Sequence, residues 1–166
     1  MDIVRTLKHL LTPPWLLRRQ ISRTMLRRIE QAIADSERTH LGEPLLVIET
    51  VLPWRDALRG MSARERAIEI FSEMRVWDTE YNSGVLIYLL LADRDIEIVA
   101  DRGIHAKIGE AGWDAICSAM EKHLHEGEFE AGLMEGLRAV STLLRHHFPT
   151  QNNNNPDELP NHPVLL

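Results

Sequence analysis

Oxygen-bearing side chains gather in one short stretch of the sequence. Residues 77–84 place Asp78, Glu80 and Asn82 at alternating positions, and Asp101 follows a later apolar segment. Carboxylate and amide oxygens at alternating loop positions suit a hard cation such as calcium or magnesium. These four residues are therefore the candidate ligands of a metal site. The alternative is a solvated acidic loop in which Asp78 or Asn82 caps the turn.

Two predicted strands position this acidic segment. Residues 84–91 and 96–100 are apolar and rich in β-branched side chains, and the turn-forming Asp93-Arg94-Asp95 lies between them. This pattern is typical of an antiparallel hairpin. Because hairpin partners run in opposite directions, the start of the first strand lies beside the end of the second. We therefore expect Asp101 to lie next to the loop that enters the hairpin.

The opposite end of the hairpin carries a second acidic group. Asp93 and Asp95 flank the turn, and Glu49 with Thr50 ends an earlier apolar run. Ligands of α/β sheets often bind at the carboxyl ends of parallel strands, so this edge is a rival site. The alternative is that the aspartates are turn residues favoured for backbone geometry.

The remaining elements follow from apolar periodicity and capping signals. Ser22 precedes one helical stripe, and Ser62 with Glu65 forms a capping box before another. The apolar run 45–51 between two prolines predicts a buried strand, and residues 113–124 and 129–144 carry two further helical stripes. The order predicts an α/β fold: a small mixed β-sheet with a right-handed βαβ crossover and a β-hairpin, sandwiched by helices.

Composition divides the 166 residues into three segments. Residues 1–21 form a basic amphipathic arm, 22–148 a single compact domain, and 149–166 a polar tail that we expect to be disordered. Residues 1–28 hold seven Lys or Arg against one Asp, a net charge of +6. Because the whole chain carries −6, the remaining residues carry a net charge of −12. An acidic body repels nucleic acid, which excludes a DNA or RNA partner from the prediction.

The N-terminal arm has the pattern of a short surface helix. Ile3, Leu7, Leu10 and Leu11 share one helical face, and basic residues and Trp15 accompany them. Such a helix can lie on an anionic membrane or dock on a protein partner, and the alternative is that it packs on its own domain. No apolar run reaches the length of a membrane span or a signal peptide. The expected localisation is cytoplasmic, with membrane association through the arm.

Signatures of the common enzyme classes do not occur. The sequence lacks a nucleophile elbow, a phosphate-binding P-loop, a dinucleotide-binding turn and a zinc-protease motif. The single cysteine, Cys117, lies on an apolar helical stripe, which favours an inert buried thiol. His123 and His125 face different sides of one predicted helix, and His105 is a lone histidine after Asp101. No catalytic residue and no organic cofactor site are therefore assigned.

Four segments together resemble the TPM domain family. They are Trp77-Asp78-Thr79-Glu80, the run from Asn82 to Tyr88, the run from Ala92 to Ile104, and Gly127-Glu128-Phe129-Glu130-Ala131-Gly132-Leu133. The resemblance spans about residues 22–148 and implies a helix-sheet-helix sandwich. The family includes thylakoid-lumen proteins linked to photosystem repair, and this chain is similar to its shorter bacterial branch. Acid phosphatase activity and calcium binding are associated with the family, which by resemblance points to Asp78, Glu80 and Asp101.

Three functions fit these residues. The first is an accessory domain that binds a divalent cation or a protein partner at the acidic edge. The second is a metal-assisted acid phosphatase in which Arg102 or Arg94 binds the phosphate. The third is a structural interaction module that docks on a membrane or complex and needs no small ligand. Fold alone does not choose between them.

Overall fold

The computed structural model describes residues 3–150 and 158–166, and its centre is a mixed four-stranded sheet. The strands are β1 (Glu43–Glu49), β2 (Gly84–Leu90), β3 (Asp95–Ala100) and β4 (Val164–Leu165), in the order β3-β2-β1-β4. β1 is parallel to β2 and to β4, and β2 is antiparallel to β3. The predicted crossover and hairpin are both confirmed.

β1 begins and ends two residues earlier than predicted, because Pro44 lies inside the strand rather than before it. Glu43 donates its N–H to the Ser83 carbonyl on the β2 side (3.3 Å). Successive N–H positions of a strand alternate sides, so the nitrogen of Pro44 faces the other side. There β4 pairs only at Val47 and Ile48, so the missing N–H breaks no ladder hydrogen bond.

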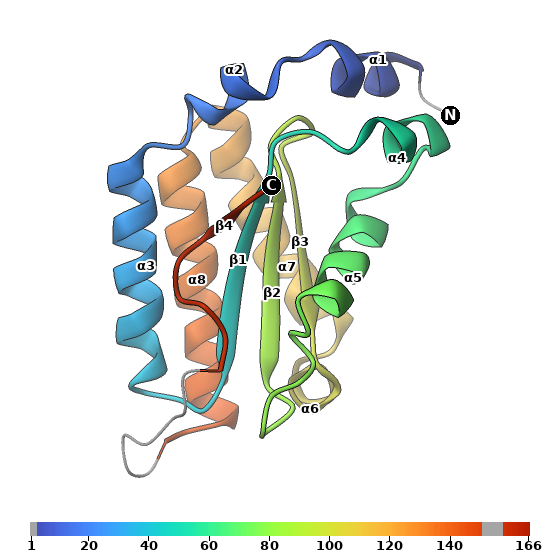
Figure 1. The fold of residues 1–166 in the computed structure, drawn as a ribbon. Helices are drawn as coiled ribbons and strands as arrows, with labels where there is room; N and C mark the ends of the chain where they lie inside the picture. The colour runs from blue at the N-terminus through green and yellow to red at the C-terminus, as the bar shows by residue number, and fades with distance from the viewer. Residues whose placement is uncertain (1–2, 151–157) are drawn as a thin grey trace.

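Helices cover both faces of the sheet (Figure 1). α3 (Arg23–Glu37), α7 (Glu110–Glu126) and α8 (Phe129–His147) pack on one face, and α4 (Trp54–Arg59) and α5 (Ala63–Glu73) pack on the other. Alternate strand residues enter the two cores: Leu46 and Ile48 join the first, and Leu45 and Val47 the second. Every residue of β1 and β2 is buried, as expected for strands covered on both faces.

The capping signals read from the sequence act as predicted. Ser22 Oγ accepts from the Met25 N–H at the start of α3. Ser62 and Glu65 form a complete capping box at the start of α5. The short helices α4 and α6 (Arg102–Ile108) were not predicted. His105 consequently lies on a helix rather than in a loop.

The prediction of a disordered polar tail is wrong for residues 158–166. Leu159 is buried against the α5 face, and Val164–Leu165 form β4 beside β1. Backbone hydrogen bonds join Leu166 to Ile48 (3.0 Å) and Thr50 to Leu166 (3.3 Å). The part of the predicted tail at 151–157 lies outside the described residues.

The N-terminal arm contains α1 (Ile3–Leu11) and α2 (Pro14–Arg18). Both helices lie at the end of the molecule that also holds α4 and the β2–β3 turn (Figure 1). Among the helices of the described ranges, none combines the length and apolar character that crossing a membrane requires.

Candidate functional site

The loop before β2 and the start of α6 enclose a pocket of about 450 Å³, here called the loop pocket. The hairpin brings its two sides together, because the Asp101 N–H donates to the Gly84 carbonyl at 2.9 Å. The lining residues are Phe71, Ser72, Trp77, Asp78, Thr79, Asn82, Ala100, Asp101 and Arg102. The structure thus places three of the four predicted ligands around one hollow.

Asp101 is the most confined of these residues, with 5% of its surface exposed. It caps α6: its Oδ1 accepts from the Arg102 N–H at 2.6 Å. Its Oδ2 is buried and has no hydrogen-bond partner among the described residues. A buried carboxylate oxygen without a donor costs free energy unless something else satisfies it. Asp101 therefore lines the loop pocket and carries one buried carboxylate oxygen that no described residue satisfies.

Close backbone packing fixes the loop around Asn82. Asn82 has φ +50°, a left-handed conformation that asparagine tolerates better than most residues. A Cβ at Gly103 would lie 2.5 Å from the Asn82 carbonyl oxygen, so no larger residue fits there without displacing the backbone. Ser83 is tied to Thr79 Oγ1 (3.1 Å) and to the Leu41 carbonyl (2.8 Å). The Asn82 backbone is thus held next to α6.

Asp78 lines the loop pocket, whereas Glu80 does not. Asp78 lies on the rim, half exposed, and pairs with Arg75. Glu80 is exposed and does not line the pocket, and its backbone N–H donates to the carboxylate of Glu158. Asp78 and Glu80 do not share one side because the loop forms a turn, in which the Asn82 N–H donates to the Thr79 carbonyl (3.2 Å). This turn breaks the strand-like alternation assumed from the sequence.

Thr79 takes the inward position that sequence reasoning gave to Glu80. It is buried and lines the loop pocket. Arg102, which directly follows Asp101, also lines it, whereas Arg94 lies at the other end of the hairpin and donates to the His125 carbonyl (3.1 Å). Of the two arginines considered for phosphate binding, only Arg102 is at this pocket.

Two of the three carboxylates at the rival acidic edge, Glu49 and Asp93, are engaged by other side chains, and burial raises the pKa of the third, Asp95. Glu49 is buried and accepts from Arg66 (3.0 and 3.2 Å) and from the Tyr88 hydroxyl (2.7 Å). Burial and the neighbouring Glu49 charge raise the pKa of Tyr88, so it remains a neutral donor. Asp93 accepts from Arg5 (2.8 Å) and faces His9 (3.0 Å). In contrast to Asp101, the carboxylates of Glu49 and Asp93 are engaged by side chains of the chain itself.

A third group, His123 with Glu126 and Glu128, has ligand atoms within 4.8 Å of one another on the surface. Both ring nitrogens of His123 already face carboxylates, Glu128 and Glu135, at 2.8 Å. The hydrogen bond to Glu128, followed by that to Glu135, raises the pKa of His123. Both ring nitrogens of His123 are thus engaged by carboxylates of the chain itself and are not available as metal ligands in this arrangement.

The other candidate side chains are unsuited to catalysis. Burial, followed by the charge of Glu97, raises the pKa of the Cys117 thiol to about 12, so the thiolate needed for nucleophilic attack is not formed near neutral pH. His105 is exposed on α6 and is not among the residues that line the loop pocket.

Comparison with known proteins identifies the family. The family model of the TPM domain matches residues 19–143, and the chain belongs to this family. The structure is similar to the NMR structure of the BA42 protein from the psychrophilic bacterium Bizionia argentinensis, with TM-score 0.76 and 26% identity over 87% of this chain and 94% of that one. No match was found among curated proteins.

A second solved structure shares the fold alone. It is the N-terminal domain of a protein from P. gingivalis, determined by solution NMR, with TM-score 0.62 and 18% identity. The match covers 79% of this chain and 83% of that chain. The TPM-like α/β architecture expected from the sequence is therefore confirmed.

Proposed function

We propose that this TPM domain is an accessory domain whose loop pocket binds a divalent cation, with Asp101, Asp78 and Asn82 as ligands. The observation that carries the proposal is that Asp101, which lines the loop pocket, has a buried carboxylate oxygen, Oδ2, with no partner among the described residues. Among the described residues, the rival acidic edge has no buried carboxylate oxygen without a partner, and its Glu49 and Asp93 are bonded to cationic side chains.

The other ligands suit a site that water completes. Asp78 can turn from Arg75 toward the pocket at little cost, because exposed ion pairs contribute only about 0–1 kcal/mol. Asn82 supplies a neutral oxygen from a fixed loop. Two carboxylates with an amide leave several positions for water, which magnesium retains readily and calcium accepts in flexible geometry. Both ions are therefore the probes to use.

The test is a titration of calcium and of magnesium into chelator-treated protein, followed by backbone amide and tryptophan indole NMR shifts. Saturable shifts at residues 77–84 and 101–103 are the expected result. Asp101→Asn, which keeps the shape of the helix cap, should weaken binding at least tenfold. Absence of shifts at millimolar metal would overturn the proposal and favour an interaction module without a small ligand.

Two matched variants distinguish cation binding at the loop pocket from a general effect of the negative charge of the domain. Asp78→Asn and Asp35→Asn each remove an exposed aspartate paired with an arginine three residues away; the aspartate side chains are 50% and 55% exposed. Only Asp78→Asn should weaken binding of the cation. Equal effects would mean that the metal responds to the overall negative charge of the domain rather than to a built site.

Arg102 supports a second candidate function, a metal-assisted phosphatase. Its position in the loop pocket would let a guanidinium bind a phosphate whose charge the cation neutralises while activating a water. Hydrolysis of p-nitrophenyl phosphate should then require the cation and fall in both Asp101→Asn and Arg102→Gln. Turnover that survives Asp101→Asn would come from another site or from a contaminant.

A further inference from the structure

Helix α1 packs on the domain through its polar side. Thr6 and His9 are its buried residues, and Arg5 is partly buried, whereas Leu7 and Leu11 on the opposite side are 48% and 73% exposed. An amphipathic helix of a globular protein ordinarily does the reverse and buries its apolar stripe. The apolar side of α1 is therefore left facing outward by the fold.

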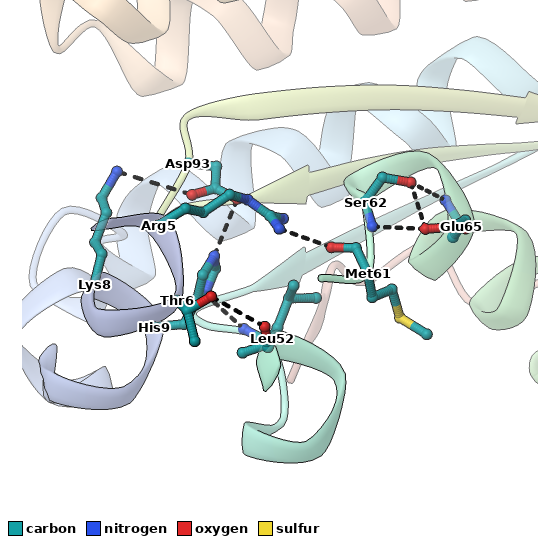
Figure 2. A network of polar contacts seen from close by, with 10 residues as sticks. Arg5, Thr6, Lys8, His9, Leu52, Met61, Ser62, Glu65 and Asp93 are labelled. Atoms are coloured by element: carbon teal, nitrogen blue, oxygen red, sulfur yellow. Dashed lines mark hydrogen bonds and ion pairs between the residues drawn. The ribbon is translucent and has the colours of Figure 1, made fainter. Parts of the chain in front are cut away.

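Directional polar contacts maintain this orientation (Figure 2). Asp93 in the β2–β3 turn is bound by Arg5 Nε at 2.8 Å and faces His9 Nε2 at 3.0 Å. His9 Nδ1 accepts from the Leu52 N–H (3.1 Å), and Arg5 Nη1 donates to the Met61 carbonyl (2.8 Å). We call these contacts the polar anchor of α1. They join α1 to three separate segments, so the helix cannot rotate its apolar side inward without breaking them.

The exposed apolar surface extends beyond α1. Of the 14 large apolar side chains that the described residues expose, nine lie on α1, α2 and α4. Leu10 of α1 and Trp54 of α4 line one hollow together with Arg18 of α2, so the three helices form one surface, here called the helical end surface. Such a concentration at one end marks an interaction site rather than scattered surface residues.

The charge of the helical end surface indicates which class of partner it binds. Helices α1, α2 and α4 hold five Lys or Arg against one acidic residue, Asp56, whereas the chain as a whole carries a net charge of −6. Arg19 stacks over Trp15 (4.9 Å) and Arg55 over Trp54 (5.1 Å), which places guanidinium groups beside amphipathic rings. Leucine, tryptophan and arginine together are the composition of helices that lie in an anionic bilayer interface. Symmetric pairing with a second copy would instead oppose like charges.

We propose that the helical end surface docks on an anionic lipid bilayer. The acidic remainder of the molecule is repelled by the same lipid, so the surface charge also sets the orientation of the bound protein. The site is independent of the loop pocket, which lies at the other end of the β-hairpin.

Vesicle sedimentation of the full chain tests the proposal, with chelator present so that the cation site plays no part. The protein should sediment with vesicles of phosphatidylcholine and phosphatidylglycerol at a 7:3 ratio and remain in solution with pure phosphatidylcholine. Leu7→Glu should reduce binding about tenfold or more, because an apolar side chain leaves the interface and a repelled charge replaces it. Ile68→Glu is the matched control, since Ile68 on α5 is also 48% exposed; it should bind like the parent chain.

Tryptophan fluorescence gives a second measurement that does not depend on an introduced charge. Brominated lipid chains in the anionic vesicles should quench the tryptophan fluorescence of the parent protein. The double variant Trp15→Phe/Trp54→Phe should lose that quenching. Its remaining tryptophans are Trp77 at the loop pocket and Trp113 in the core. Equal binding to neutral and anionic vesicles, or binding that survives Leu7→Glu, would overturn the proposal. So would a lipid-free dimer that Leu7→Glu abolishes, because the occupant would then be a second copy.

Discussion

His40 shows how one buried side chain makes stability depend on pH. It is completely buried, its Nδ1 lies 3.0 Å from the Gly42 carbonyl, and its Nε2 has no partner among the described residues. Burial lowers the pKa of His40 to about 4, although the hydrogen bond to Gly42 acts in the opposite direction. The folded protein therefore holds His40 neutral at pH values where an unfolded chain protonates it.

We expect the free energy of unfolding to fall as pH decreases from about 6.5 to about 4. In this range only the unfolded state takes up the proton, so the stabilisation is complete above pH 6.5 and lost on approaching pH 4, about 3 kcal/mol in total. Urea unfolding at pH 7.5 and 4.5 measures it. His40→Gln should flatten this part of the pH dependence, and His105→Gln, at an exposed position, should not. An unchanged slope in His40→Gln would contradict the assignment.

Tyr88 provides a second prediction at the scale of one hydrogen bond. Its buried hydroxyl donates to Glu49 at 2.7 Å, and Glu49 also binds Arg66. Tyr88→Phe should lower the free energy of unfolding by about 2 kcal/mol, because a buried charged acceptor loses a donor. Tyr81→Phe, at a 40% exposed position, should change it by less than about 0.5 kcal/mol. Denaturant unfolding of the two variants compares them directly, and equal effects would show that the Glu49 contact is energetically neutral.

At the residue scale, the sequence predicted where the candidate site lies but not every residue that lines it. Hairpin geometry was enough to bring Asp78, Asn82 and Asp101 together, because strand pairing is set by local turn chemistry. Glu80 was misplaced because a turn within the loop points Thr79 inward instead. Such a turn depends on packing against Leu41 and Gly103, which are distant in sequence.

At the scale of elements, strong local signals predicted most of the fold. The helices with serine caps and the hairpin follow from nearby residues, whereas α4, α6 and β4 are too short to carry a periodic pattern. β4 in particular is defined by pairing with Val47 and Ile48, more than a hundred residues earlier. The helical character of α1 was also evident, but the side it turns to the domain depends on Asp93, which periodicity does not reveal.

Asp93→Asn should release α1 while leaving the sheet folded. Burial opposes ionisation of Asp93, but hydrogen bonds from His9 and Arg5 lower its pKa below the usual value. The contacts of Asp93 in the polar anchor are therefore lost only as pH falls through that lowered pKa. We expect faster amide hydrogen exchange in α1 at pH 7, with exchange in β1 and β2 unchanged. Asp114→Asn, at an exposed position on α7, is the control; unaltered exchange in α1 of Asp93→Asn would mean that other contacts hold the helix.

At the scale of the whole molecule, the C-terminal segment joins parts of the chain that are otherwise separate. Leu159 packs in the core beneath α5, and its N–H lies 3.3 Å from the Glu43 carboxylate. Val164 and Leu165 then cover the edge of β1. The segment therefore links the helical layer of α5 to the sheet edge.

Leu159→Ala should lower the free energy of unfolding by about 2–3 kcal/mol, because an 8% exposed leucine leaves a cavity. Leu165→Ala, at a 40% exposed position, should cost less than about 0.5 kcal/mol. Thermal or denaturant unfolding of both variants checks the difference. If Leu159→Ala is neutral, the segment follows the surface without contributing to the core.

The run of β2 from the loop pocket to the β2–β3 turn restricts what could react in the pocket. Seven strand residues span roughly 23 Å, so the pocket and the polar anchor are separated by about that length. On a bilayer bound through the helical end surface, the loop pocket faces away from the lipid headgroups. A phosphate ester hydrolysed there would have to arrive from the aqueous phase or on a partner macromolecule, and membrane phospholipids would be out of reach.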